Sequence, residues 1–132
     1  DRTILVLAGA SFDLFIEGEP AAALRAGGSP HAFSGDRAAR CAVVGPSRDF
    51  NVMTRRGRVT HAVTREAGEG ARAIERARGV GWVIYVVDGE ASAGEVRAGA
   101  GECLVIEPGP EDREPIRLRA AGARVVVRLQ GA

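Results

Sequence analysis

The stretch from Val83 to Gly109 reads VIYVVDGEASAGEVRAGAGECLVIEPG, and it decides the fold. Two short apolar runs flank a segment of Gly, Ala and charged residues: 82–87, which begins one residue before the quoted stretch, and 103–106. The first run ends at Asp88-Gly89, a pair that favours a tight hairpin turn, and the second ends just before Pro108-Gly109. Apolar runs of this length between turn signals are typical of strands. The stretch therefore predicts β-structure.

The rest of the chain follows the same pattern. Short apolar or alternating runs are separated by Gly, Pro, Asp and Ser, which predicts about ten strands and favours a sandwich or barrel. Residues 66–78 differ, because they are rich in Ala, Glu and Arg without a clear apolar stripe. We expect a mobile surface connection there, with a short helix at 71–77 as the alternative. The other predicted strands are 4–8, 11–17, 42–44, 58–65 and 124–129, with shorter pieces near Asn51, Val96 and Ile116.

An internal repeat underlies this pattern. The first copy reads ILVLAGA at 4–10 and LRAGGSPHAFSGD at 24–36, and the second is the stretch quoted above. Both contain an apolar strand, a Gly turn (Gly9, Gly89), an intervening strand and an aliphatic-Arg-Ala-Gly step. Each turn needs the backbone freedom of Gly. The repeat predicts a single domain, 1–132, built from two related β-units of about 1–57 and 58–132.

Composition excludes several classes of function. The chain has 132 residues and a formal net charge of +1, and all 18 basic residues are Arg. Acidic and basic residues are interleaved and aromatic residues are few, which argues against nucleic-acid binding. No apolar run approaches the length of a membrane span, and the chain does not open on a secretory leader.

The two cysteines lie far apart in the sequence. Cys41 and Cys103 each sit in an apolar stretch, where a cysteine is usually a small buried hydrophobe. A disulfide and a reactive thiol are the alternatives. The buried interpretation favours a cytoplasmic protein.

The repeated scheme resembles the cupin superfamily, and the segment between the repeats is more specific. Phe33-Ser-Gly-Asp36, followed by GPSRDFNVMTRRG at 45–57, resembles the HutD/Ves family of bicupin-like proteins associated with histidine utilisation. The opening Asp1-Arg2-Thr3 also resembles an internal segment of that family. The resemblance implies an all-β cupin-type double-stranded β-helix, or jelly roll. It also implies a further N-terminal family segment, with a Trp-x-Asn-Gly element, that this sequence does not contain.

The central element carries the candidate ligand-binding residues. If 49–56 is a strand, Asp49, Asn51, Met53 and Arg55 point to one face, and Arg56 points to the other with its neighbours. A carboxylate, a carboxamide, a thioether and a guanidinium suit the wall of a polar pocket, where an Arg binds a carboxylate bidentately. An internal ion pair of Asp49 with an Arg, bridged by Asn51, is the structural alternative.

Metal and covalent catalysis lack sequence support. Metal-binding cupins use two His in an HxH arrangement, a Glu and a third His, whereas this chain has only His31 and His61. We expect His31 to be a solvated or capping histidine in a loop, and His61 to be a core histidine. No Gly-x-Ser-x-Gly elbow or phosphate-binding Gly loop is present. We therefore expect no metal, no cofactor and no catalytic residue.

The resemblance implies a non-catalytic protein that binds a small carboxylate metabolite and senses or regulates histidine breakdown. A metal-dependent isomerase or dioxygenase is one alternative, and a structural or partner-binding subunit is another. Since a two-unit β-roll has exposed strand edges, we also expect a homodimer.

Overall fold

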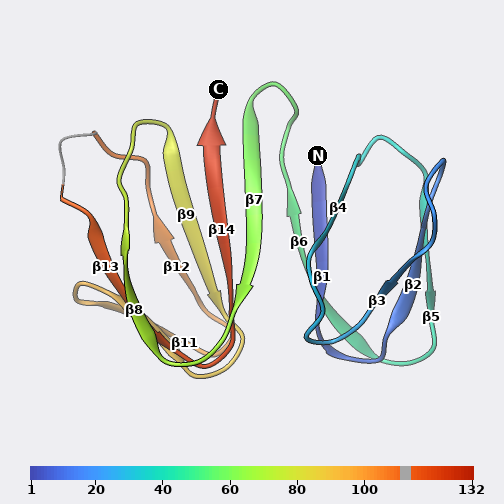
Figure 1. The fold of residues 1–132 in the computed structure, drawn as a ribbon, viewed down its shortest axis with the longest axis horizontal. Helices are drawn as coiled ribbons and strands as arrows, with labels where there is room; N and C mark the ends of the chain where they lie inside the picture. The colour runs from blue at the N-terminus through green and yellow to red at the C-terminus, as the bar shows by residue number, and fades with distance from the viewer. Residues whose placement is uncertain (111–113) are drawn as a thin grey trace. The chain divides into compact units, whose positions relative to one another are not determined.

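The computed structural model describes residues 1–110 and 114–132, and the regular elements among them are all strands. The chain divides into two compact units, Asp1–Arg56 and Gly57–Ala132 (Figure 1). Each unit is a pair of antiparallel sheets. The predicted all-β fold of two related β-units is confirmed. Among the described residues, no helix is long and apolar enough to cross a membrane.

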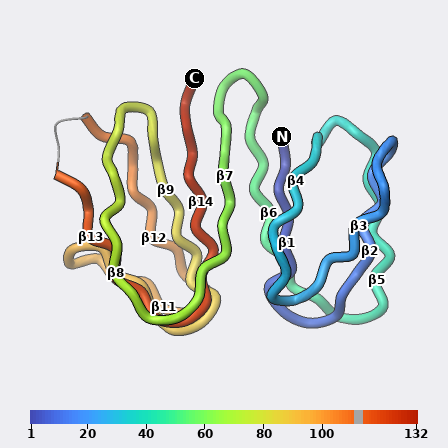
Figure 2. Tube along the Cα trace, in the orientation of Figure 1, coloured from blue at the N-terminus to red at the C-terminus, as the bar shows by residue number. Residues whose placement is uncertain are grey.

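Unit 1 has three strands in each sheet. The chain passes from one sheet to the other between the first two strands, as the trace in Figure 2 shows. The first sheet has the order β4 (His31–Phe33), β1 (Arg2–Gly9), β6 (Ser47–Met53), and the second has the order β3 (Ala22–Leu24), β2 (Phe12–Ile16), β5 (Ala39–Val43).

The core of unit 1 lies between its two sheets. Phe12, Leu14 and Ile16 alternate along β2 and pack against Ile4 and Val6 of β1. This alternation is the period-two pattern of a strand with one buried face. Each such side chain contributes roughly 1.5–3 kcal/mol when it is fully buried.

Unit 2 has four strands in each sheet. Its apolar core contains side chains from both sheets, among them Ile84, Leu118 and Val126. The orders are β12 (Cys103–Ile106), β9 (Val80–Val86), β14 (Arg124–Gly131), β7 (Val59–Glu66) in one sheet, and β11 (Val96–Gly99), β10 (Glu90–Ala93), β13 (Ile116–Ala121), β8 (Gly70–Ile74) in the other.

The two units share one topology. Strands β1 to β6 correspond in order to β9 to β14, and unit 2 has β7 and β8 in addition, beside β14 and β13. Gly9 and Gly89 occupy equivalent turns with φ of +88° and +74°. A Cβ at Gly9 would lie 2.3 Å from the Pro46 carbonyl oxygen, and one at Gly89 would lie 2.2 Å from that of Ala121. Only Gly permits two backbone segments to approach this closely, so the repeated Gly is a structural requirement.

Three local expectations are wrong. Residues 70–74 form strand β8, neither a loop nor a helix, and Ile74 is buried in the core. His31 begins strand β4 and is half-buried, so it is not a solvated loop residue. Cys41 and Cys103 are both exposed and free, because every residue of β5 is exposed and because Cys103 lies on the face of β12 opposite the buried Leu104.

The two ends of each unit are adjacent. In unit 1, the Asp1 nitrogen donates to the Thr54 carbonyl oxygen at 2.9 Å, and the Thr54 nitrogen donates to the Asp1 carbonyl oxygen at 3.0 Å. In unit 2, the Ala132 nitrogen donates to the Arg58 carbonyl oxygen at 2.9 Å.

Candidate functional site

Strand β6 places three of the predicted site residues on one face. Asp49 pairs with Val6, Asn51 with Ile4 and Met53 with Arg2 across the β1–β6 ladder. Directly paired residues share a face of the sheet. Since Ile4 and Val6 belong to the core, Asp49, Asn51 and Met53 lie on the inner face of the first sheet. Their predicted common face is confirmed.

The alternation of side chains along β6 does not extend to Arg55 and Arg56. Strand β6 ends at Met53, so Arg55 and Arg56 lie beyond it, in the segment that leads to a turn. The expectation of one continuous strand over 49–56 is wrong at this end. Arg55 is exposed. Arg56 forms an ion pair with Asp1, the residue before β1.

Arg2 completes the inner face. Its Nε and Nη2 atoms donate to the Asn51 Oδ1 atom at 2.9 and 2.7 Å. Its guanidinium lies 5.3 Å from the centroid of the Phe33 ring, a cation–π contact. Among the described residues, Arg2 forms no salt bridge with a carboxylate. The half-buried Arg2 thus offers a positive charge whose nearest polar partner is a neutral amide.

Asn51 connects Arg2 to Asp49. The Asn51 Nδ2 atom donates to the Asp49 Oδ2 atom, so the amide is oriented by its two neighbours. Strand β4 flanks β1 on the side away from β6. On β4, His31 pairs with Ile4 and stacks on Phe33 with ring centroids 6.1 Å apart. The His31 Nε2 atom is buried without a hydrogen-bond partner in the described structure. The inner face therefore presents cationic, amide, carboxylate and imidazole groups together.

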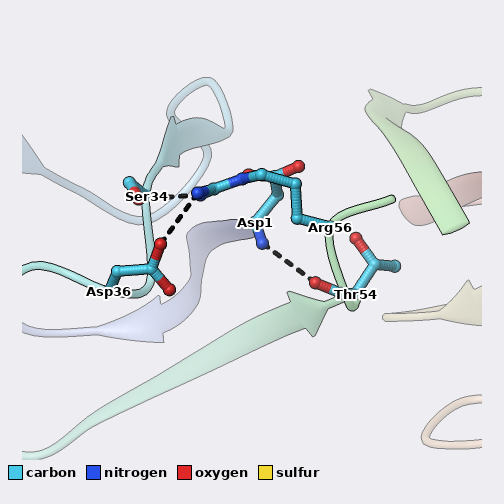
Figure 3. Close-up of polar contacts among 5 residues, drawn as sticks. All are labelled: Asp1, Ser34, Asp36, Thr54 and Arg56. Carbon is cyan, nitrogen blue, oxygen red and sulfur yellow. Dashed lines mark hydrogen bonds and ion pairs between the residues drawn. The ribbon is translucent and has the colours of Figure 1, made fainter. Parts of the chain in front are cut away.

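Arg56 lies in a separate cluster of polar contacts (Figure 3). Its Nη1 atom binds the Asp36 Oδ2 atom at 2.8 Å, and its Nη2 atom binds the Asp1 Oδ1 atom at 3.0 Å. Nη2 also donates to the Ser34 hydroxyl at 2.9 Å. The side chains of Arg56 and Asp36 are 57% and 75% exposed, so solvent screens these ion pairs. The cluster ties the segment after β6 to the loop after β4.

Comparison with known proteins identifies the family. The sequence matches the HutD family over residues 1–126. This chain belongs to the HutD family. HutD from Pseudomonas fluorescens SBW25, from a structure in a formate condition, is 23% identical, with a TM-score of 0.79, and the match covers 99% of this chain and 68% of that one. A conserved protein of unknown function from Pseudomonas aeruginosa PAO1 is 26% identical, with a TM-score of 0.73 and coverage of 98% and 68%.

A comparison with curated proteins gives no match. The HutD family match and the shared fold confirm both the resemblance and the cupin-like architecture, and they make this a cupin-like protein related to histidine utilisation.

The described part of this HutD-family chain contains no group of three or more His, Cys, Asp or Glu side chains placed to hold a metal ion. His31 and His61 belong to different units. The donor set therefore does not fit the three-His-one-carboxylate centre of metal-binding cupins.

Sequence reasoning missed Arg2 as a site residue. The Asp1-Arg2-Thr3 segment was visible as part of the family resemblance, and Arg2 lies just outside the predicted strand 4–8, although it is the first residue of β1. Its contact with Asn51, however, depends on the register of β1 against β6, which residues 49 positions apart do not reveal.

Proposed function

We propose that this HutD-family protein binds a small carboxylate metabolite on the inner face of the first sheet of unit 1. It acts without catalysis, as a cytoplasmic sensor or regulator of histidine breakdown. Asp49, Asn51, Met53 and Arg2 face the ligand, and Arg55 and Arg56 lie at the rim of the site.

The observation that carries the proposal is the unneutralised charge of Arg2. A guanidinium binds a carboxylate with two parallel charge-assisted hydrogen bonds, which are stronger than its bonds to a neutral amide. Asn51 supplies both a donor and an acceptor beside it. The exposed Asp49 and Met53 leave this edge of the sheet open to solvent, so a ligand can reach Arg2.

A thermal-shift screen with urocanate, formylglutamate, formate and glutamate at millimolar concentration tests the proposal. A ligand present at about 100 times its Kd stabilises the folded state by about 2.7 kcal/mol. We expect one of these compounds to raise the melting temperature of the wild type and to lose that effect in Arg2→Gln. Arg37→Gln, which removes an exposed pair with Glu19 in the same unit, is the matched control and keeps the shift.

Asn51→Asp is a second variant that preserves the shape of the site. Its carboxylate gives Arg2 an ionic partner and repels an incoming carboxylate, so we expect the ligand-induced shift to disappear. The proposal is wrong if none of the four compounds stabilises the protein, or if both variants respond like the wild type.

A structural role is the second candidate, and the ion pairs of Arg56 with Asp1 and Asp36 favour it. In that case Arg56→Gln lowers the melting temperature but leaves every ligand-induced shift unchanged. A smaller ligand-induced shift in this variant would mean that Arg56 contacts the ligand.

A further inference from the structure

The inner face of unit 2 carries a polar cluster at one edge of its apolar core. On β14, Arg124 and Arg128 share a face with the buried Val126. Glu66 of β7 lies opposite Arg124, and Trp82 of β9 lies opposite Arg128. Arg72 joins them from β8 in the other sheet. Glu66, Arg72, Arg124, Trp82 and Arg128 therefore form one row of contacting side chains between the two sheets.

One end of this row is fixed by hydrogen bonds. Glu66 binds Arg124 through Oε2 at 3.1 Å and Arg72 through Oε1 at 3.2 Å. Arg124 also donates to the carbonyl oxygens of Gly68 and Gly122 at 2.9 and 3.0 Å, and its side chain is only 11% exposed. Most donors of Arg124 are thus used, and Arg124 with Glu66 forms a rigid wall.

The other end carries positive charge in excess. The guanidinium groups of Arg72 and Arg128 both lie 5.9 Å from the centroid of the Trp82 ring. Arg128 donates to the Gln130 Oε1 atom at 2.8 Å and binds no carboxylate among the described residues. The row therefore contains three guanidinium groups and one carboxylate, that of Glu66, which pairs with Arg72 and Arg124 and not with Arg128. Since both arginines contact the same ring and Arg128 has no carboxylate partner among the described residues, this end of the row has positive charge available for an anion.

A cavity lies beside this row. Its volume is about 130 Å³, and it is lined by Glu66, Arg72 and Arg124 with the small residues Gly70, Ala71 and Ala120 and with Leu118. Neither Trp82 nor Arg128 is among these residues, so the cavity borders the Glu66 end of the row, and Arg72 connects it with the Trp82 ring.

Trp82 supplies an independent indication. Its indole Nε1–H group is buried and has no hydrogen-bond acceptor in the described structure. A buried donor without an acceptor costs free energy, and such groups are rare in native proteins. An oxyanion held by the two arginines at the Trp82 ring would supply the missing acceptor.

We propose that unit 2 contains a second anion-binding site, in which Arg72 and Arg128 bind a small carboxylate beside Trp82. The guanidinium forks favour a planar carboxylate, which accepts two parallel hydrogen bonds. This site is separate from the one proposed in unit 1 and does not depend on it.

Tryptophan fluorescence reports on this site alone, because Trp82 is the one tryptophan of the chain. Acetate and succinate are titrated into the full chain at constant ionic strength, with chloride as the balancing anion. We expect a saturable change in Trp82 emission with half-saturation in the millimolar range. Arg72→Gln and Arg128→Gln should each weaken binding by about tenfold or more, since each removes a charged hydrogen-bond partner.

Two further variants separate a site from a general effect of charge. Arg119→Gln removes an exposed arginine that faces a different concavity of unit 2, so the titration should be unchanged. Arg72→Lys keeps the charge but loses the planar fork, and we expect intermediate affinity. Far-UV circular dichroism of each variant verifies that the sheets remain folded.

The proposal is overturned if neither acid gives a saturable change, or if Arg72→Gln, Arg72→Lys and Arg128→Gln all titrate like the wild type. Arg2→Gln distinguishes the two sites. It should abolish the thermal shift assigned to unit 1 while the Trp82 titration stays unchanged, so either proposal can fail without the other.

Discussion

His61 gives the stability of this protein a dependence on pH. It is half-buried on β7, opposite Leu129 of β14, and burial lowers the pKa of the imidazole below its usual 6.5. The unfolded chain therefore takes up a proton at a higher pH than the folded chain does. The contribution of His61 to stability is complete above pH 6.5 and is lost as the pH falls below that value.

We expect the free energy of unfolding, measured with urea, to decrease between about pH 7 and pH 5. In His61→Gln this decrease should be smaller, because glutamine does not titrate. An identical pH dependence in the variant and the wild type would show that another group is responsible.

At the scale of single residues, the candidate site of unit 1 could be predicted in part from the sequence. The common face of Asp49, Asn51 and Met53 follows from strand alternation alone, which is a local property. The contacts of Arg2 with Asn51 and of Arg56 with Asp36 and Asp1 join distant parts of the chain, and no local pattern encodes them.

At the scale of the element, Gly9 and Gly27 allow two effects to be separated. Both have positive φ, +88° and +78°, but only a Cβ at Gly9 would meet backbone, 2.3 Å from the Pro46 oxygen. We expect Gly27→Ala to cost about 1–2 kcal/mol from backbone strain alone, and Gly9→Ala to cost clearly more. Urea denaturation of both variants measures the difference, and equal losses would mean that the approach of Pro46 is easily relieved.

The turns also show where the repeat was misaligned. The Gly28 nitrogen donates to the Arg25 oxygen around Gly27, and the Glu102 nitrogen donates to the Gly99 oxygen around Gly101. Gly27 therefore corresponds to Gly101, with φ of +85°, although the sequence aligns it with Gly99. Matching the residue letters hid this shift, because the two segments are both rich in Gly.

Strand β8 was missed for a different reason. Its sequence, GARAI, contains small and charged residues with weak strand propensity. Pairing with β13, in which Ile74 lies opposite Ile116, makes it a strand. Tertiary contacts decide the structure of such a segment, so its own sequence could not.

At the scale of the whole molecule, the two units differ in their edges. In unit 2, β7 and β8 lie beside β14 and β13, whereas the equivalent β6 and β5 are edge strands within the described part of unit 1. Strand β5 is exposed along its whole length, and Val43 is 54% exposed. Open strand edges with apolar side chains favour pairing between chains.

We therefore expect this 132-residue chain to self-associate through β5, with a mass that rises with concentration in size-exclusion chromatography with light scattering. Val43→Lys should shift it towards the monomer, since charged side chains on an edge strand oppose pairing. Val105→Lys, at an exposed position of β12, should not. A monomer at every concentration, or an effect of Val105→Lys alone, would contradict this prediction.

The adjacency of the two ends within each unit has a consequence for protein engineering. Because Asp1 hydrogen-bonds to Thr54, and Ala132 to Arg58, a short linker is enough to join the ends of either unit. New termini could then be opened at an exposed turn, such as Gly18 in unit 1 or Gly94 in unit 2. Circular permutation at these turns would test whether each set of strands keeps its fold when its connections are changed.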